Sequence, residues 1–277
     1  YDDGLQTTLE RVAVNYVGVT INYRLTDQRL NEQGEIDKDG PITRNPWPAQ
    51  IHDAKCAVSW IRANADNVDI FPVKINTDKI GVAGISAGRQ LALMLGETSA
   101  TSLFGPTDCE NDASSSVQAV VSYAGLADVE SAWGTKSNLV RPMYQKLLSL
   151  HTDDTLRNTN FDDLSNNTRE LLLNTSPLNF STMGSVPVRL IHAVNDKLSP
   201  PATSLCFYEG LDPAVRDRSL LWLNRGGHTF NSGVREHADA QMLNWFDKHL
   251  RNIDLPLLCS ECEIPVPEDI SCIAPED

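Results

Sequence analysis

The sequence has no run of about 18 apolar residues, so no segment is suited to span a bilayer as a helix. Basic residues are also scarce: 23 lysines and arginines stand against 37 acidic residues, and the formal net charge is -14. A charge of this sign repels nucleic acid and anionic membrane surfaces, which argues against both as partners. No signal peptide is visible, but the chain opens with Tyr1 and not Met, so we expect its natural start to be missing.

Internal repeats and low-complexity segments are absent as well, which leaves an ordinary globular composition with 41% hydrophobic and 22% charged residues. The 277 residues are enough for one large core. Basic residues stop at Arg251, whereas the segment that follows carries seven acidic residues and three of the six cysteines. The composition therefore predicts a catalytic domain at 1–251 and an acidic, cysteine-containing tail at 252–277.

The tail cysteines, Cys259, Cys262 and Cys272, resemble half a zinc site, but no histidine lies near them and a structural zinc needs four ligands. A disulfide within the tail, or from the tail to the body, is the favoured interpretation, with unpaired thiols and a metal as the alternatives. A disulfide favours an oxidising compartment, so we expect a secreted or periplasmic location. Cys56 lies in a predicted helix and is interpreted as a small core residue.

Apolar, β-branched runs alternate with helical patterns along the chain. Strands are expected at 12–23, 79–83, 117–123, 186–194 and 219–223. Helices are expected after Pro46 and Pro48, at 90–96 and at about 234–250, and an insertion with helical and irregular parts is expected at 127–180. Strands separated by helices predict a mostly parallel sheet in a three-layer α/β/α sandwich.

The strongest chemical signal is the sequence Gly-Ile-Ser-Ala-Gly at 84–88, which joins a predicted strand to a predicted helix. A serine at such a sharp turn is lifted above the sheet, and glycines on both sides of it avoid steric clashes. The motif predicts Ser86 as a nucleophile. The N–H of Ala87, at the start of the helix, is then a candidate donor to an oxyanion.

A serine nucleophile needs a base, and the base needs an orienting acid. Asp196 follows one predicted strand, and His228 follows the next after two glycines, so both are expected at the edge of the sheet where Ser86 lies. The chain order Ser, Asp, His is that of the α/β hydrolases. The remaining histidines are interpreted as packed or solvated: His52, His151, His192, His237 and His249.

Several stretches resemble α/β-hydrolase esterases of the hormone-sensitive-lipase and feruloyl-esterase-like type. They are NYRL at 22–25, WPAQ at 47–50, SWIRANA at 59–65, GISAG at 84–88, SPL at 176–178, and GGH at 226–228, together with Asp196 and the Ser-Pro pair at 199–200. The resemblance covers roughly residues 12–250. It implies an α/β-hydrolase fold and a serine carboxylic-ester hydrolase that works through an acyl-enzyme, without a metal or cofactor.

Two features depart from that family's pattern. Arg89 and Gln90 follow the serine motif where the family usually has glycine and histidine, so Arg89 is expected either to point away from the site or to narrow it. The His-Gly-Gly loop that completes the family's oxyanion hole is absent, and so is the strand expected between 12–23 and 79–83. An incomplete N-terminus is the favoured explanation; a longer precursor and a segment from the tail or a second subunit are the alternatives.

The sequence therefore predicts an esterase with Ser86, His228 and Asp196 as a catalytic triad, acting on small esters with short-chain or aryl groups. A serine peptidase of the prolyl-oligopeptidase type shares the triad order, and a non-catalytic binding protein is the alternative that the missing loop favours. Trp133, Met143 and Tyr144 fall in the insertion. Core packing and a role in lining a substrate pocket are equally compatible with their positions.

Overall fold

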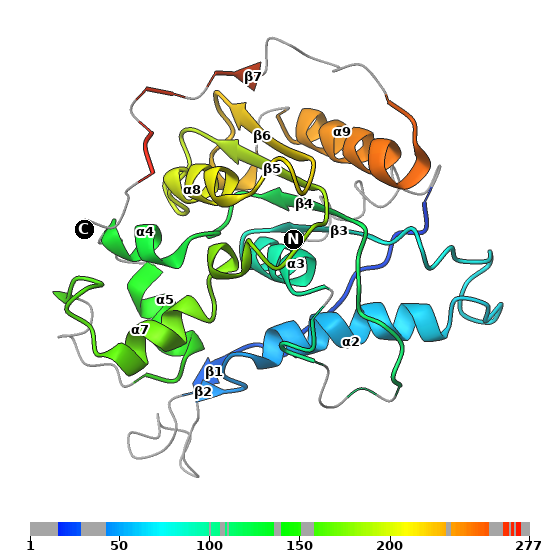
Figure 1. The fold of residues 1–277 in the computed structure, drawn as a ribbon, viewed down its shortest axis with the longest axis horizontal. Coiled ribbons are helices and arrows are strands. Elements are labelled where there is room, and N and C mark those ends of the chain that lie inside the picture. The colour runs from blue at the N-terminus through cyan, green and yellow to red at the C-terminus, as the bar shows by residue number, and fades with distance from the viewer. Residues whose placement is uncertain are drawn as a thin grey trace.

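Five strands pair side by side in one sheet of the computed structural model, in the order β3, β4, β5, β6, β7 (Figure 1). The first four are parallel, and β7 is antiparallel to β6. The strands are β3 (Gly81–Ile85), β4 (Ala119–Tyr123), β5 (Val188–Ala193), β6 (Arg218–Leu223) and β7 (Glu263–Ile264), with a separate antiparallel pair of β1 (Asp27–Gln28) and β2 (Thr43–Arg44). The structure describes residues 16–28, 43–99, 101–105, 109, 111–135, 140–150, 158–230, 234–254, 263–265, 267–268 and 270–272.

Helices cover both faces of the sheet. Residues of α2, α3 and α8 share one apolar cluster with β4 and β5, and α9 packs in a second cluster on the opposite face (Figure 1). The helices are α2 (Ala49–Ala63), α3 (Ala87–Glu97), α4 (Val129–Gly134), α5 (Val140–Leu147), α7 (Asn166–Leu173), α8 (Ala202–Gly210) and α9 (Val234–Phe246). The predicted three-layer α/β fold is confirmed, with helices in the connections between parallel strands.

The central strands are apolar because both of their faces are covered. In β4, Ala119, Val121 and Tyr123 face the α9 cluster, while Val120 faces the cluster that contains α3. All of these side chains are buried, which explains why apolar residues occupy both faces of the strand, with Ser122 as its one polar member, where a half-exposed strand would alternate. The four strands predicted from 79 onward are all formed, with ends that differ from the prediction by at most two residues.

The strand predicted at 12–23 is wrong for the part that the structure describes. Residues 16–23 have no regular secondary structure, and Val17, Val19 and Ile21 are exposed; residues 12–15 lie outside the described residues. A β-branched run forms a strand only where a neighbouring strand supplies hydrogen-bond partners. Among the described residues β3 pairs with β4 alone, and the segment at 16–23 is paired with neither.

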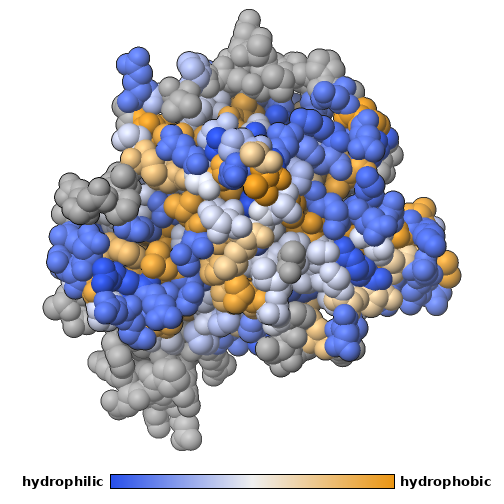
Figure 2. All heavy atoms as spheres, in the orientation of Figure 1, coloured by the Kyte–Doolittle hydropathy of each residue, from blue (hydrophilic) through white to orange (hydrophobic). Residues whose placement is uncertain are grey.

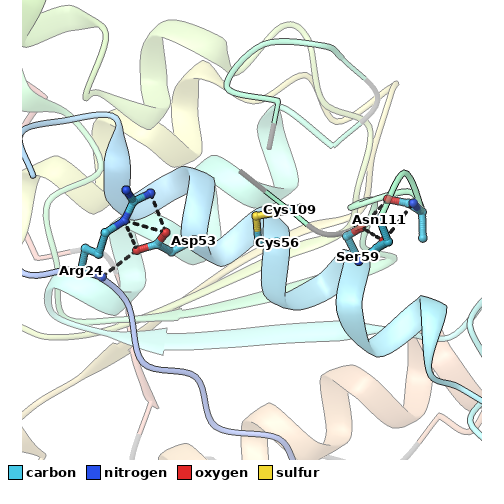
Figure 3. The surroundings of a disulfide bond; sticks show 7 residues. Arg24, Asp53, Cys56, Ser59, Cys109 and Asn111 are labelled. Atoms are coloured by element: carbon cyan, nitrogen blue, oxygen red, sulfur yellow. Dashed lines mark hydrogen bonds and ion pairs between the residues drawn. A yellow bond between two sulfur atoms is a disulfide. The ribbon is translucent and has the colours of Figure 1, made fainter. Parts of the chain in front are cut away.

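This N-terminal segment is fixed at its two ends instead. The Tyr16 hydroxyl donates a hydrogen bond of 2.7 Å to Asp247, just after α9. At the other end the Arg24 guanidinium forms an ion pair of 2.8 Å with Asp53 of α2, which Figure 3 shows beside the helix. The segment therefore connects elements that lie on opposite faces of the sheet.

The insertion between β4 and β5 has a small core of its own. Trp133 of α4 and Tyr144 of α5 are fully buried in it, whereas Met143 is exposed. The Trp133 indole donates to the backbone carbonyl of Thr159 at 3.0 Å. The structure therefore supports core packing for the two buried aromatic residues.

The prediction for Cys56 is wrong, because it forms a disulfide with Cys109 (Figure 3). The polar segment after Cys109 lies along α2, where the Ser59 hydroxyl contacts Asn111 at 2.5 Å and the carbonyl of Ala113 at 2.7 Å. The disulfide and these contacts together attach that segment to the helix. No pattern in the sequence pointed to this partner, because Cys109 lies in a polar stretch.

The tail is also attached to the body. Cys272 forms a disulfide with Cys206 of α8, as the favoured interpretation of the tail allowed, and β7 extends the sheet beside β6. Cys259 and Cys262 lie outside the described residues. The predicted link between tail and body is therefore confirmed for Cys272.

The described helices include none that is long and apolar enough to cross a bilayer. On the face in Figure 2, apolar side chains are interspersed with hydrophilic ones. The exposed apolar residues include Val68 and Val73, in the loop between α2 and β3.

We expect Cys272→Ser to lower the free energy of unfolding by about 2–4 kcal/mol, because the cross-link closes a long loop in the unfolded chain. The two cysteines are 66 positions apart. Urea unfolding without reductant, followed by tryptophan fluorescence, measures the change. Ser271→Ala, at the exposed neighbouring position, is the matched control, and equal stability of Cys272→Ser and the control would contradict the assignment.

Candidate active site

The turn between β3 and α3 holds Ser86 in an unusual backbone conformation. Its φ is 54° and its ψ is -120°, values that cost energy for any residue other than glycine. The Ser86 N–H donates to the carbonyl of Tyr123 at 3.1 Å, which ties the turn to the end of β4. Such strain persists only where the surrounding structure enforces it, and here it presents the serine side chain at the carboxyl edge of the sheet.

The two glycines of the motif do not have the same role. A Cβ on Gly84 would lie 2.1 Å from the carbonyl oxygen of Gly88, so only glycine allows the chain to fold back this closely. A Cβ on Gly88 would meet no atom within 4 Å among the described residues. The predicted steric requirement is confirmed for Gly84 and is wrong for Gly88, because nothing described packs against the second glycine.

His228 lies in a short turn after β6 that two glycines make possible. Gly226 and Gly227 have φ values of 118° and 59°, in the left-handed region that other residues rarely adopt. The Gly227 N–H donates to the side-chain oxygen of Asn195 at 2.9 Å. The turn that carries His228 is therefore held against the loop that carries Asp196.

The structure brings the three predicted site residues together. The distance between Ser86 Oγ and His228 Nε2 is 2.9 Å, and the distance between His228 Nδ1 and Asp196 Oδ2 is also 2.9 Å. Both are hydrogen-bond distances. The His228 side chain is partly exposed, whereas the Asp196 side chain is fully buried beneath it. This geometry allows a proton to pass from the serine hydroxyl to the imidazole.

Asp196 is held as an anion by several donors. Its Oδ1 accepts the backbone N–H groups of Leu198 at 2.8 Å and Ser199 at 3.0 Å. Burial acts to raise the pKa of Asp196, but the hydrogen bonds from His192, His228 and Ser199 outweigh it and hold the pKa well below its usual range. The carboxylate is therefore ionised at neutral pH.

Ala87 is the first residue of α3. The first N–H groups of a helix have no acceptor within the helix, and the helix dipole adds a partial positive charge there. Ala87 is exposed next to Ser86. Its amide therefore remains a candidate donor to an oxyanion.

Arg89 does not narrow the site, because its side chain is buried in the interior. The guanidinium donates to the carbonyl of Gly125 at 2.7 Å and to the Ser204 hydroxyl at 2.8 Å. It also lies 3.2 Å from Nδ1 of His192. The structure therefore agrees with the expectation that Arg89 points away from the site.

His192 is the residue near the site that the sequence pattern did not reveal. It is buried in β5, as expected, but its Nε2 lies 3.2 Å from Asp196 Oδ2. The signal that could have suggested this contact is its spacing of four residues from Asp196, across the end of the strand. Asn195 was also missed, although it directly precedes Asp196.

The other described histidines lie in other elements, with His52 in α2, His237 in α9 and His249 in the π-helical turn Asp247–Arg251; His151 lies outside the described residues. Within the described ranges, no group of three or more His, Cys, Asp or Glu residues is arranged to hold a metal ion.

Solved structures identify the fold class. A truncated carbohydrate esterase from gut microbiota superposes with a TM-score of 0.56 at 22% identity, covering 73% of this chain and 70% of that one. At this identity the similarity establishes the fold alone. The parallel sheet, the strained serine turn and the order of the site residues define an α/β hydrolase.

The family is shown by sequence. The BD-FAE family model matches residues 2–211, and the chain belongs to the BD-FAE family, which has an esterase-like α/β-hydrolase fold. The predicted resemblance is confirmed. Two relatives from Mycobacterium tuberculosis are the esterase LipQ, 25% identical over 79% of this chain, and the probable carboxylic ester hydrolase LipM, 27% identical over 61%. The matches cover 48% and 35% of those proteins, so this chain spans about half or less of their length.

We expect Gly84→Ala to distort the turn and to lower the free energy of unfolding by about 1–3 kcal/mol or more, because its Cβ cannot fit against backbone. Gly88→Ala is the matched control in the same turn, with open space at its Cβ. Chemical denaturation of both variants measures the difference. A Gly84→Ala variant as stable as Gly88→Ala would contradict this account of the turn.

Proposed function

We propose that this protein hydrolyses carboxylic esters through an acyl-enzyme formed on Ser86, with His228 as the base and Asp196 as the residue that orients it. The observation that most directly supports this is the continuous hydrogen-bond path from Ser86 Oγ through His228 to Asp196, at 2.9 Å for each step. Residues 1–251 would form the catalytic unit, and residues 252–277 an appended tail.

In the first half of the reaction, the Ser86 hydroxyl oxygen attacks the ester carbonyl carbon while its proton passes to His228 Nε2. The carbonyl oxygen becomes an oxyanion, which the N–H of Ala87 would stabilise. His228 then donates the proton to the departing alkoxide, so that an alcohol leaves and the acyl group remains on Ser86.

In the second half, a water molecule takes the place of the alcohol. His228 accepts a proton from the water as its oxygen attacks the acyl carbon, and it returns that proton to Ser86 Oγ as the acid leaves. His228 becomes a cation in both halves. The buried Asp196 carboxylate, 2.9 Å from its Nδ1, stabilises that cation without itself taking the proton.

Small esters with short-chain or aryl groups are the substrate class that we propose. The mycobacterial relatives are named an esterase and a probable carboxylic ester hydrolase, and the similar solved structure is a carbohydrate esterase. A panel of p-nitrophenyl esters of increasing chain length, with acetylated sugars and aryl esters beside them, tests this range. Preference for long-chain esters across the panel would contradict the short-chain proposal.

Ser86→Ala should reduce ester hydrolysis by several orders of magnitude, because it removes the oxygen on which the acyl-enzyme would form. Hydrolysis of p-nitrophenyl acetate measures the loss, and circular dichroism checks that the fold is retained. Ser122→Ala is the matched control: Ser122 is a buried serine in the adjacent strand β4, and its removal should leave hydrolysis nearly unchanged. Retained hydrolysis in Ser86→Ala would exclude this serine as the nucleophile.

The same variants distinguish the other candidate functions. A fluorophosphonate probe should label Ser86 in the wild-type protein and in Ser122→Ala, but not Ser86 in Ser86→Ala, with mass spectrometry locating the label. Labelling together with cleavage of peptides and no ester preference would favour a serine peptidase. A folded protein that neither reacts with the probe nor hydrolyses any ester of the panel would favour a binding protein.

A further inference from the structure

A series of buried polar side chains continues from Asp196 into the interior, away from Ser86. It consists of His192 at the end of β5, Arg89 near the start of α3 and Ser204 in α8, each with 0% of its surface exposed. Polar groups buried this completely are costly unless they are paired. Their contacts therefore determine how each group is oriented.

Arg89 determines which groups in this series donate and which accept hydrogen bonds, because a guanidinium can only donate. Burial lowers the pKa of Arg89 to about 9, which leaves it a cation at neutral pH. Its NH1 group lies 3.2 Å from His192 Nδ1, and its NH2 group donates to the Ser204 hydroxyl at 2.8 Å. A donor facing Nδ1 requires that this nitrogen carries a lone pair and no hydrogen.

Ser204 also favours a His192 ring whose Nδ1 carries a lone pair and no hydrogen. Its oxygen accepts the hydrogen bond from Arg89, so its own hydrogen is available to His192 Nδ1, 2.5 Å away. Burial lowers the pKa of His192 to about 4, so the ring is neutral at neutral pH and carries a single N–H. With Nδ1 accepting, that hydrogen must be on Nε2.

The Nε2–H of His192 is directed at the Asp196 carboxylate. It lies 3.2 Å from Asp196 Oδ2 and 3.2 Å from the carbonyl oxygen of Ser199. Asp196 Oδ2 is also the atom that accepts from His228. In the other tautomer, the His192 lone pair would face the carboxylate and repel it.

We propose that Arg89 and His192 are positioning residues for the Ser86 site: Arg89 selects the Nε2–H tautomer of His192, and that tautomer holds the Asp196 carboxylate in place for His228. This proposal rests on the proposed function. Neither residue touches the reacting atoms, so each would act through Asp196.

The groups around His192 determine how losing its hydrogen bond to Asp196 would change the protonation of His228. Charged groups face it from two elements, Arg89 from α3 and Asp196 from the loop after β5, while Ser204 of α8 and the Trp222 ring of β6, 6.2 Å away, are uncharged. A carboxylate that loses one donor acts more strongly on its remaining partner. Asp196 would then favour the protonated form of His228, which cannot accept the serine proton.

His192→Leu removes the donor while preserving bulk, and His192→Gln keeps an N–H that can reach the carboxylate and an oxygen that can accept from Arg89. We expect His192→Leu to lower kcat about tenfold with little change in KM. We also expect the acidic limb of the profile of kcat/KM against pH to move upward by roughly 0.5–1 unit. His192→Gln should restore most of the rate and the wild-type profile.

The control variant is Glu97→Gln at the other end of α3. Glu97 is buried and forms a 2.5 Å ion pair with Arg216, so this change disturbs the same helix without contact to Asp196. It should lower stability and leave the pH profile in place. If His192→Leu has the wild-type pH profile, or if Glu97→Gln moves the profile equally, the positioning role is wrong.

A second measurement does not depend on activity. A long-range proton–nitrogen correlation spectrum of labelled wild-type protein distinguishes the two tautomers of a neutral histidine. We expect the Nε2–H form for His192, and a shift toward the Nδ1–H form in Arg89→Met. The Nδ1–H form in the wild type would overturn the proposal. Absence of probe labelling at Ser86 together with the expected tautomer would instead count against the proposed function.

Discussion

The burial of α3 on all sides is the constraint on which the rest of the structure depends. Nine consecutive residues from Arg89 to Glu97 are buried, so the helix packs against the sheet, α2 and the insertion at once. Its polar members are paired with separate elements: Gln90 donates to the Thr175 carbonyl and Glu97 pairs with Arg216. A helix fixed in this way can neither rotate nor slide, and Ser86 directly precedes its first residue. The strained turn is maintained because the helix that follows it has no alternative position.

Parallel pairing explains why residues far apart in the sequence meet at one place. Ser86, Asp196 and His228 each follow a strand of the same sheet, namely β3, β5 and β6. The carboxyl ends of parallel strands lie along one edge, so a short loop after each strand is enough to bring its side chain to the site. Ser86 and His228 are 142 positions apart in the sequence, and the side-by-side pairing of β3 to β6 brings them together.

The sequence predicted those parts of the molecule whose signals are local. The serine motif, the two glycines before His228 and the four apolar strands from 79 onward each depend on a few adjacent residues, and the structure contains all of these. The segment at 16–23 was mispredicted because a strand also needs a partner, which no local pattern reports. The pairing of Cys56 with Cys109 was missed for the same reason. His192 was assigned correctly to a buried strand, but burial alone does not distinguish a histidine that only packs from one that contacts the Asp196 carboxylate.

Behind Ser86, the neutral ring of His192 separates a buried cation, Arg89, from a buried anion, Asp196. His192 lies between the Arg89 cation and the Asp196 anion, 3.2 Å from each. A direct ion pair between the two would neutralise the carboxylate and compete with His228 for its oxygen atoms. A neutral imidazole instead accepts a hydrogen bond from Arg89 at Nδ1 and donates one to Asp196 from Nε2. Most of the negative charge then stays on Asp196. Burial and the cation on one side keep the ring neutral, and the anion on the other side receives its only N–H. The buried arginine thus supports an ionised, oriented carboxylate without becoming its counter-ion.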